Sequence, residues 1–424
     1  MTKVLIVMNA MTHYFNLIAS RINEREGVEI KMVVPGNDSP GIGEGVFQTS
    51  NGANFEIIQL EERTEEKEAY LWFPELDKVI LSFRPDIVLV GPGHLRCIWE
   101  RRELIRKTGA KIILKSIPFR VPDLAEARKR FKEELDKNPL PGFSSLPRSF
   151  GKVFNILGIS RLYKKAVVDR RSVREFESRF EFPAKLYNFP DAHVNYIDDA
   201  IGIYGGYGVP ARKIFITRNS PDTDLMFSIR EEISGMEPVL PPNPYRIVHL
   251  SRLVEWKRVD MLITALADLS DDYPGAELLI LGDGPEKDRL HEQARKLGVE
   301  SRVRIEGGVY DPVLLGRYLA TCSLYILAGM GGLSINDAMI FGLPVICSVC
   351  DGTEKFLVRE GYNGTYFESG NQNSLEERIR YLFNHPDLMK KMGENSAAII
   401  RNEVNIHTVV DGYMKAFRFV TGNH

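Results

Sequence analysis

Apolar and polar residues alternate along the chain in blocks that predict short buried strands separated by amphipathic helices. In residues 1–120, short aliphatic runs such as 28–34 and 87–90 are typical of buried strands, and the stretches between them place apolar residues at helical spacing. The predicted strands span residues 3–9, 28–34, 55–60, 87–90 and 112–114, and the predicted helices span residues 14–23, 74–83 and 95–107. A repeated strand–helix–strand order predicts a doubly wound parallel sheet.

The same alternation returns after Tyr245 and predicts a second sheet of the same kind. Its predicted strands span residues 247–250, 278–281, 303–305, 324–327 and 345–347, and its helices span residues 259–268, 287–297, 314–320 and 333–341. The sequence therefore predicts an α/β protein with two Rossmann-like, doubly wound parallel-sheet domains. Ligands of such sheets bind beyond the carboxyl ends of the strands, so we expect the site in a cleft between the two domains.

Composition marks the join between the two halves. Residues 219–224 and 239–244 are rich in turn residues and proline, which is typical of a linker. A chain of 424 residues also exceeds what one hydrophobic core usually serves. The predicted divisions are an N-terminal domain at 1–218 with a helical basic insertion at about 122–181, a linker at 219–244, a C-terminal domain at 245–403 and a helix at 404–424 that crosses back to the N-terminal domain.

The overall charge argues against a nucleic-acid partner. The formal net charge is only −2, so the molecule as a whole has no basic field that would attract a phosphate backbone. Four cysteines are too few for a disulfide framework and fit a reducing compartment. No apolar run reaches the roughly 18–20 residues that a membrane span needs, and we expect a cytoplasmic protein.

One segment departs from the alternating pattern. Residues 148–174 are rich in Lys and Arg, contain Asp169 as their single acid, and interleave aromatic and aliphatic residues. A basic amphipathic helix of this kind can lie on anionic lipid headgroups, which would place the protein peripherally at the inner membrane face. Alternatively, the segment is a helical lid whose charged face is only solvated, or it grips an anionic ligand.

The strongest candidate for a binding site is the glycine-rich turn and helix AGMGGLSINDAMIFGLP at 328–344. Backbone N–H groups would be free at the helix start, where the helix dipole favours an anion such as a diphosphate. They belong to Gly331, Gly332, Leu333 and Ser334. Asp337, one turn further along, could accept hydrogen bonds from ribose hydroxyls. The alternative is that the glycines only mark a turn of the fold.

A basic pair follows the first predicted strand of the second half. Arg252 and Lys257 lie in the turn between the strand at 247–250 and the next helix. A guanidinium offers a planar fork to phosphate oxygens and an ammonium offers a point charge, so together they could neutralise a diphosphate leaving group. Alone, the two residues would be ordinary surface charges. The glycine-rich turn further along the chain is also expected to bind anions, and this favours a diphosphate-binding role for the pair.

In this order and spacing, the motifs resemble those of a known family, the retaining, nucleotide-sugar-dependent glycosyltransferases of group four, which have the GT-B fold. The similar segments are IVHLSRLVEWKRVDMLI at 247–263, LILGDGPEKDRL at 279–290, VRIEGGV at 303–309, the helix at 333–348, DGTE at 351–354 and GYNG at 361–364. The resemblance implies a retaining, metal-independent enzyme without a cofactor, for which a nucleotide sugar is a co-substrate.

The resemblance also implies roles for single residues. Arg252 and Lys257 fall where the family holds the donor diphosphate, and they would be catalytic because they stabilise the leaving group. Asp337 falls where a glutamate of the family holds the ribose, and the glycine-rich turn before it belongs to the same donor site. Gly308 and Val309 fall near the nucleobase.

One departure from the family concerns the donor sugar. The family's motif has two glutamates separated by seven residues, and this chain has Gly329 in the first position and Asp337 in the second. The primary prediction is a hexosyltransferase-type enzyme that moves a sugar to a glycan or lipid-linked acceptor in envelope polysaccharide or glycoconjugate synthesis. Because the first glutamate normally contacts the donor sugar, an alternative stays open: a catalytically impaired GT-B protein that is a binding or regulatory subunit of a glycosylation complex.

The N-terminal half would bind the acceptor. The turn after its first strand contains Thr12 and His13, and the turn after the strand at 87–90 contains His94. We predict that His94 is catalytic and that Thr12 and His13 lie on the acceptor side. For both histidines the alternative is a structural or solvent-exposed imidazole.

Overall fold

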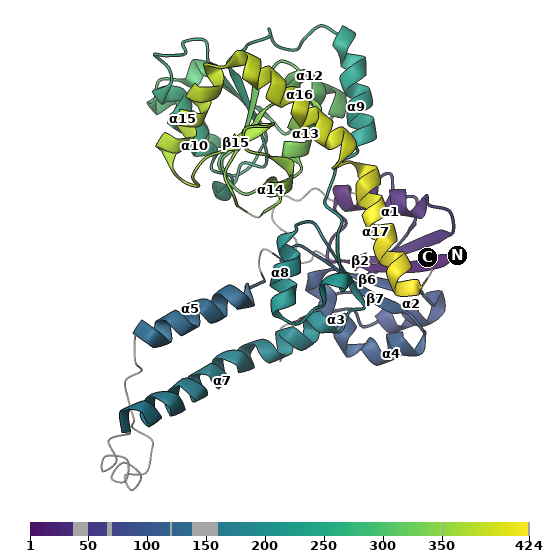
Figure 1. Cartoon of the computed structure of the whole chain (residues 1–424). Helices are drawn as coiled ribbons and strands as arrows, with labels where there is room; N and C mark the ends of the chain where they lie inside the picture. The colour runs from purple at the N-terminus through teal and green to yellow at the C-terminus, as the bar shows by residue number, and fades with distance from the viewer. Residues whose placement is uncertain (37–49, 66–69, 119–120, 138–159, 351, 423–424) are drawn as a thin grey trace.

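The computed structural model describes residues 1–36, 50–65, 70–118, 121–137, 160–350 and 352–422. Within these ranges the chain forms two parallel sheets, and helices cover both faces of each sheet (Figure 1). This is the predicted α/β architecture of two doubly wound domains. Their strands are nearly continuous apolar runs because each sheet is buried on both faces.

The N-terminal sheet has the strand order β3-β2-β1-β6-β7-β8-β9, and every adjacent pair is parallel. Its strands are β1 (Thr2–Val7), β2 (Val28–Pro35), β3 (Glu56–Leu60), β6 (Ile87–Val90), β7 (Lys111–Ser116), β8 (Ala192–Asn195) and β9 (Ile214–Ile216). A small antiparallel hairpin of β4 (Arg63–Glu65) and β5 (Tyr70–Trp72) follows β3.

Two sets of helices enclose the N-terminal sheet. Helices α1 (His13–Asn23) and α17 (Ile406–Thr421) bury their apolar faces on one side of it. The other side is covered by α2 (Leu76–Phe83), α3 (Leu95–Glu100), α4 (Arg102–Lys107) and α8 (Asp199–Gly206). The last helix of the chain therefore lies on the first domain (Figure 1).

The C-terminal sheet has the strand order β12-β11-β10-β13-β14-β15. Its strands are β10 (Arg246–Leu250), β11 (Glu277–Leu281), β12 (Val303–Gly307), β13 (Leu324–Leu327), β14 (Val345–Cys347) and β15 (Gly364–Tyr366). Its helices are α9 (Thr223–Glu232), α10 (Val259–Asp268), α11 (Lys287–Lys296), α12 (Pro312–Leu319), α13 (Ser334–Ile340), α14 (Glu354–Leu357), α15 (Gln372–Phe383) and α16 (Pro386–Asn402). Helices α10, α11 and α15 cover one face, and α9, α12 and α13 cover the other.

The segment predicted as a linker at 219–244 is largely part of the C-terminal domain. Helix α9 lies inside it, and its buried Met226, Phe227 and Ile229 pack into the core with strands of the C-terminal sheet. The linker was predicted from its prolines and turn residues. That prediction did not identify Asp222 as a helix cap, which accepts a hydrogen bond from Leu225 N at 3.2 Å.

The helical insertion consists of α5 (Leu124–Lys137) and α7 (Ser160–Asn188), which lie side by side and extend away from the N-terminal sheet (Figure 1). Arg128 of α5 contacts both carboxylate oxygens of Glu177 of α7 at 2.7 Å, and the rings of Phe131 and Phe176 stack. Of the basic segment at 148–174, residues 148–159 lie outside the described residues, so its membrane contact stays a prediction. None of the helices that the structure describes combines the length and apolar character needed to cross a bilayer.

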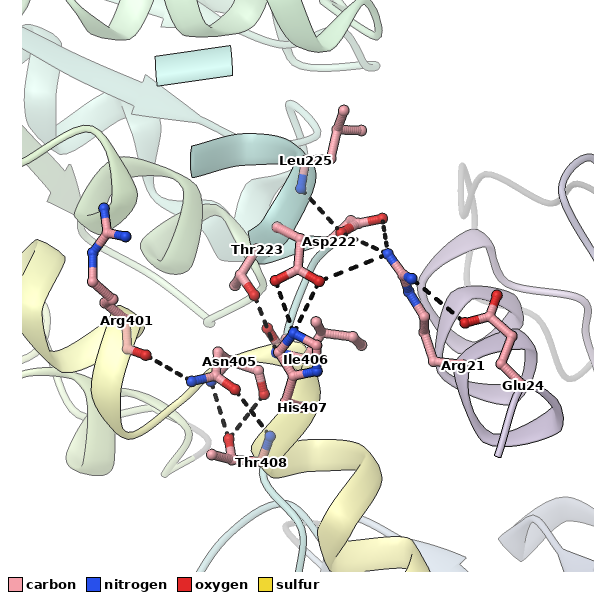
Figure 2. Close-up of polar contacts among 12 residues, drawn as sticks. Arg21, Glu24, Asp222, Thr223, Leu225, Arg401, Asn405, Ile406, His407 and Thr408 are labelled. Carbon is pink, nitrogen blue, oxygen red and sulfur yellow. Dashed lines mark hydrogen bonds and ion pairs between the residues drawn. The ribbon is translucent and has the colours of Figure 1, made fainter. Parts of the chain in front are cut away.

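The chain passes between the two domains twice, and the two passages touch (Figure 2). The first precedes α9 and the second precedes α17, and the buried Thr223 Oγ1 accepts a hydrogen bond from Ile406 N at 3.1 Å. Arg21 of α1 reaches the same place and pairs with Asp222 at 3.4 Å. The contact joins a helix of the N-terminal domain to the first turn of the C-terminal domain.

Candidate active site

The basic pair follows β10 as predicted. Arg252 lies in the loop after the strand and is half-buried, and its Nη1 is buried without a hydrogen-bond partner among the described residues. Lys257 ends a short 3-10 turn (Glu255–Lys257) and is only 7% exposed. A lysine is rarely so deeply buried unless its ammonium group has acceptors nearby.

Lys257 finds those acceptors in the glycine-rich turn. Its Nζ donates to the carbonyl oxygens of Met330 and Gly331, each at 2.7 Å. Lys257 and the turn are 73 and 74 residues apart in sequence, but β10 and β13 are neighbouring parallel strands, so their carboxyl ends meet. The structure therefore brings together the two sequence features that were each predicted to bind a diphosphate.

Gly329 lies directly against the backbone of the basic turn. A β-carbon built on Gly329 would lie 2.1 Å from the carbonyl oxygen of Trp256 and 2.7 Å from the carbonyl carbon of Lys257. Met330 N also donates to Trp256 O at 3.1 Å. Gly329 was predicted to lie in the donor site, where the resemblance implies a glutamate that this chain lacks. The structure adds a packing reason for the glycine, because this backbone leaves no space for any side chain there.

Two glycines in the loop after β11 pack in the same way. β-carbons built on Gly282 and Gly284 would lie 1.8 Å from Ser251 O and 2.4 Å from Leu253 O. The loop after β11 therefore stacks directly on the loop that carries Arg252. This close approach explains the GDG sequence without a dinucleotide site.

The helix start after the glycine-rich turn is open in part. Gly332 is exposed, Gly331, Leu333 and Ser334 are half-buried, and helix α13 begins at Ser334. Within the described part of the chain, the N–H groups of Gly331, Gly332 and Leu333 donate to no backbone carbonyl. Ser334 Oγ lies 2.8 Å from the hydroxyl of the buried Tyr325. The turn thus presents N–H groups at the carboxyl edge of the sheet, as predicted from the sequence.

Asp337 lies in the first turn of α13, and the residue as a whole is half-buried. Desolvation of its carboxyl group raises the pKa of Asp337 to about 7. The group therefore changes charge near neutral pH. As a carboxylate it can accept two hydrogen bonds from the hydroxyls of a ribose.

The predicted nucleobase region follows β12. Gly307 has a φ of +82°, which only glycine adopts readily, and Val309 is half-buried against the core. The next residue, Tyr310, is 78% exposed, and its ring folds back over Gly308. Gly308 and Val309, the residues predicted near the nucleobase, thus lie in the loop directly after β12.

The carboxyl edges of the two sheets face each other. Lys355 of α14, beyond β14, pairs with Asp199 beyond β8 at 2.7 Å. The Arg218 guanidinium lies 4.4 Å from the ring centroid of Phe356, which is also in α14. These contacts join the loops at the strand ends of both domains, so the edge that carries Arg252 and Lys257 faces the N-terminal domain across the junction.

The structure corrects the role predicted for His94. His94 follows β6 at the expected edge, but it is fully buried. Its Nε2 lies 2.7 Å from Oε1 of the buried Glu62, and its ring stacks on Phe73 at 4.5 Å between centroids. Burial lowers the pKa of His94, although Glu62 acts in the opposite direction. An imidazole enclosed in this way cannot reach an acceptor, so its role here is structural.

The other acceptor-side residues lie at the start of α1, beyond β1. Thr12 is buried at 9% exposure and is the residue before the helix. His13 is exposed and packs edge-to-face against Tyr14. Both are at the edge that faces the C-terminal domain, and His13, unlike His94, is exposed there.

Sequence reasoning missed a buried lysine at the same edge. Lys115 lies near the end of β7, is 6% exposed, and has its Nζ 4.3 Å from the ring centroid of Phe15 and 4.9 Å from that of Tyr196. Burial lowers the pKa of Lys115 to about 7. The signal in the sequence was a lysine directly after the apolar run IIL in the strand KIILKS.

Comparisons with known proteins agree with this geometry. Residues 233–398 match the protein family described as Glycosyl transferases group 1. The lipopolysaccharide core biosynthesis glycosyltransferase LpsE of Rhizobium meliloti (strain 1021) is 28% identical over 172 residues, which are 40% of this chain and 48% of that protein. The poly(ribitol-phosphate) alpha-N-acetylglucosaminyltransferase of Staphylococcus aureus (strain COL) is 24% identical over 40% of this chain and 34% of that protein. The chain thus spans about half the length, or less, of these curated relatives.

Solved structures show the same fold over nearly the whole chain. Anabaena Alr3699/HepE in complex with UDP-glucose has a TM-score of 0.62 at 16% identity and covers 98% of this chain and 99% of that chain. WaaG, a glycosyltransferase involved in lipopolysaccharide biosynthesis, has a TM-score of 0.56 at 16% identity, with 100% of both chains covered. The GT-B fold and the resemblance to its glycosyltransferases are therefore confirmed.

Proposed function

We propose that this chain, whose residues 233–398 match the family described as Glycosyl transferases group 1, transfers a sugar from a nucleoside diphosphate sugar to a glycan or lipid-linked acceptor. The observation that carries the proposal is the contact of Lys257 with the glycine-rich turn, in which Nζ lies 2.7 Å from the carbonyl oxygens of Met330 and Gly331. The contact brings a basic pair and a row of backbone N–H groups to one point on the carboxyl edge of the sheet.

The chemistry that such a site favours is departure of a diphosphate. When the bond between the sugar and the diphosphate breaks, negative charge grows on the phosphate oxygens. Arg252, Lys257 and the N–H groups of the turn can stabilise that charge, and preorganised donors of this kind lower a barrier by several kcal/mol. We propose that the acceptor attacks the face that the leaving group departs from, which retains the anomeric configuration and needs neither a metal ion nor a protein nucleophile.

The relatives narrow the proposed substrates. The Anabaena protein was crystallised with UDP and with UDP-glucose, which supports a uridine diphosphate sugar as donor. The relative from Rhizobium acts in lipopolysaccharide core biosynthesis, which supports an envelope glycan as acceptor. Such an acceptor would be met at the inner membrane face, where we place this protein as a peripheral, cytoplasmic enzyme.

A second candidate function is a GT-B protein that binds without catalysing transfer. Gly329 favours it, because the close contact with Trp256 O leaves no room for an acidic side chain that would hold the donor sugar. Such a protein would serve as a binding or regulatory subunit of a glycosylation complex. The two candidate functions differ in the activity of the donor site, since a protein that has lost donor chemistry would neither hydrolyse a nucleotide sugar nor transfer the sugar from it.

The proposal is tested by incubating the chain with UDP-glucose, UDP-N-acetylglucosamine and GDP-mannose and measuring release of the nucleoside diphosphate by mass spectrometry. We expect release from at least one donor and loss of at least 100-fold of that activity in Arg252→Ala, since removing one preorganised donor typically costs about 10²–10³ in kcat. Arg295→Ala is the matched control, because this arginine is exposed on α11. Equal turnover of Arg252→Ala and the wild type would overturn the proposed donor site.

A further inference from the structure

Lys115 places an amino group where the packing of the fold does not require one. The residue is 6% exposed, and burial alone lowers its pKa to about 7, because no charged group of the described chain acts on it. A buried ammonium group without a counter-ion is costly, whereas an uncharged side chain of the same length would fill this space without that cost. Positions where a sequence breaks a packing rule in this way are typical of functional sites.

The amino group of Lys115 lies at the carboxyl edge of the N-terminal sheet. Its Nζ is 4.3 Å from the ring centroid of Phe15, in the first turn of α1, and 4.9 Å from that of Tyr196, directly after β8. The start of α1 and Tyr196 both follow the carboxyl ends of strands, so the side chain extends from β7 toward that edge. The amino group is therefore on the side of the sheet that faces the C-terminal domain.

Two aromatic rings flank the amino group without neutralising it. Cation–π contact attracts an ammonium group, but it leaves the charge and the three N–H groups without an acceptor. Among the described residues, Nζ of Lys115 forms neither an ion pair nor a hydrogen bond. The equally buried Lys257, by contrast, donates to two carbonyl oxygens at 2.7 Å. Of these two buried lysines, Lys115 is the one whose charge is available to a ligand.

The start of α1 adds a second electropositive feature at the same point. The first turn of the helix contains no acidic residue, and Thr12, which precedes it, makes no side-chain hydrogen bond that caps the helix. The first N–H groups of a helix have no partner within the helix, and the helix dipole favours an anion there. Lys115 and the start of α1 meet at Phe15, so a single anionic group could accept hydrogen bonds from both.

We propose that Lys115 and the start of α1 form an anion subsite of the acceptor side, which binds a phosphate or carboxylate group of the acceptor. The inference rests on the proposed function and deepens it, because it makes the acceptor an anionic glycan or lipid-linked glycan. Lys115 is then a binding residue that selects the acceptor by its charge. The subsite is distinct from the proposed diphosphate site at Arg252 and Lys257, which belongs to the other domain.

The test uses three small sugars that differ in charge, namely glucose 6-phosphate, glucuronate and glucose. Binding is measured by calorimetry in the Arg252→Ala background, so that the proposed donor site does not itself hold the anions. We expect one of the two anionic sugars to bind about tenfold or more tightly than glucose, since a hydrogen bond to a charged group contributes about that much. The tighter of the two tells whether the acceptor presents a phosphate or a carboxylate.

A second substitution in the same background assigns the preference to one side chain. Lys115→Met should remove the preference for the anionic sugar, because methionine has a similar length and no charge. The variant is expected to fold, since it avoids the burial of an amino group. Lys111→Met is the matched control, because Lys111 lies in the same strand and is exposed. It should keep the full preference for the anionic sugar.

The outcomes separate this inference from the proposed function. Equal binding of all three sugars, or a preference that persists in Lys115→Met, would overturn the subsite and leave the proposed function standing. Weaker binding of UDP in Lys115→Met with Arg252 intact would assign the anion to the donor and overturn the acceptor subsite. A preference that depends on Lys115, without release of a nucleoside diphosphate from any nucleotide sugar, would overturn the proposed transfer and leave the subsite to a binding protein.

Discussion

The carbonyl oxygen of Trp256 lies where a side chain at Gly329 would begin, 2.1 Å from the position of its β-carbon. The loop after β10 and the loop after β13 therefore touch through backbone alone. We expect Gly329→Ala to force these loops apart, and overpacking of this kind typically costs about 1–3 kcal/mol of folding free energy. Thermal unfolding should show the loss. At Gly332 the nearest atom to an added β-carbon is Lys257 Nζ at 3.7 Å, so Gly332→Ala is the control. Equal melting temperatures of the two variants would contradict the prediction.

Asp337 gives the donor site a pH dependence. Burial raises the pKa of this carboxyl to about 7 in the free protein. If ribose hydroxyls donate to the carboxylate, nucleotide binding favours the ionised form, so affinity rises as the pH is raised from 6 to 8. Asp337→Asn should lose this part of the pH dependence. The titration of the nucleotide's own phosphate is common to both proteins, so the ratio of their dissociation constants isolates Asp337. A ratio that stays constant across this range would exclude the role.

Lys115 makes folding stability depend on pH. Burial lowers its pKa to about 7, whereas an unfolded lysine has a pKa of about 10.4. Between these values the unfolded chain binds more protons than the folded one, so this contribution destabilises the fold fully below pH 7 and disappears as the pH rises toward 10.4. We expect Lys115→Met to be more stable than the wild type at pH 7 by as much as a few kcal/mol.

The measurement is urea unfolding at pH 7, 8.5 and 10, with the difference between wild type and Lys115→Met shrinking as the pH rises. Lys111 lies in the same strand and is exposed, so Lys111→Met is the control and should show no such trend. A Lys115→Met variant that is less stable than the wild type at pH 7 would mean that contact with Phe15 and Tyr196 outweighs desolvation.

Thr223 joins the two passages between the domains through a buried hydrogen bond to Ile406 N (Figure 2). Thr223→Val keeps the volume and removes the acceptor, leaving a buried N–H group unpaired. Such a change typically costs about 1–3 kcal/mol of folding free energy. Thr223→Ser retains the hydroxyl and should lose much less. The free energy of unfolding of the two variants is measured by chemical unfolding. Equal losses of stability would show that the packing of the Thr223 methyl group, rather than its hydroxyl, stabilises the contact.

The local pattern of apolar and polar residues predicted most of the central strands and helices of the two sheets, but few of the peripheral elements. Helix α10 and strands β13 and β14 have the predicted bounds, because each is a continuous apolar or amphipathic block. Strands β8 and β9 were not predicted. Both are short, and β8, AHVN, carries buried polar residues with a partner distant in the sequence, since Ser116 Oγ donates to Asn195 Oδ1 at 3.0 Å.

The residues of the candidate site also differ in how far the sequence could predict their placement. Arg252 and Lys257 could be identified from the sequence because they come directly after a predicted strand. Their contact with the glycine-rich turn depends on the strand order of the sheet, in which β10 and β13 are neighbours. The burial of His94 could not be predicted from the sequence, because it depends on Glu62 and Phe73, which flank the hairpin of β4 and β5, a segment with no periodic signal. The close contact of Gly329 could not be predicted either. Its neighbour is the backbone at Trp256, and a backbone contact does not depend on which residue type is present there, so only the glycine itself is visible in the sequence.

The hydrogen bond between Thr223 and Ile406 also restricts how the molecule can move. Since both connections pass through one point, a relative rotation about an axis through that point leaves the bond intact, whereas sliding one domain along the other would break it. Opening or closing of the domains is therefore expected to proceed by rotation about this point, which would carry the proposed donor site toward or away from the edge that holds His13.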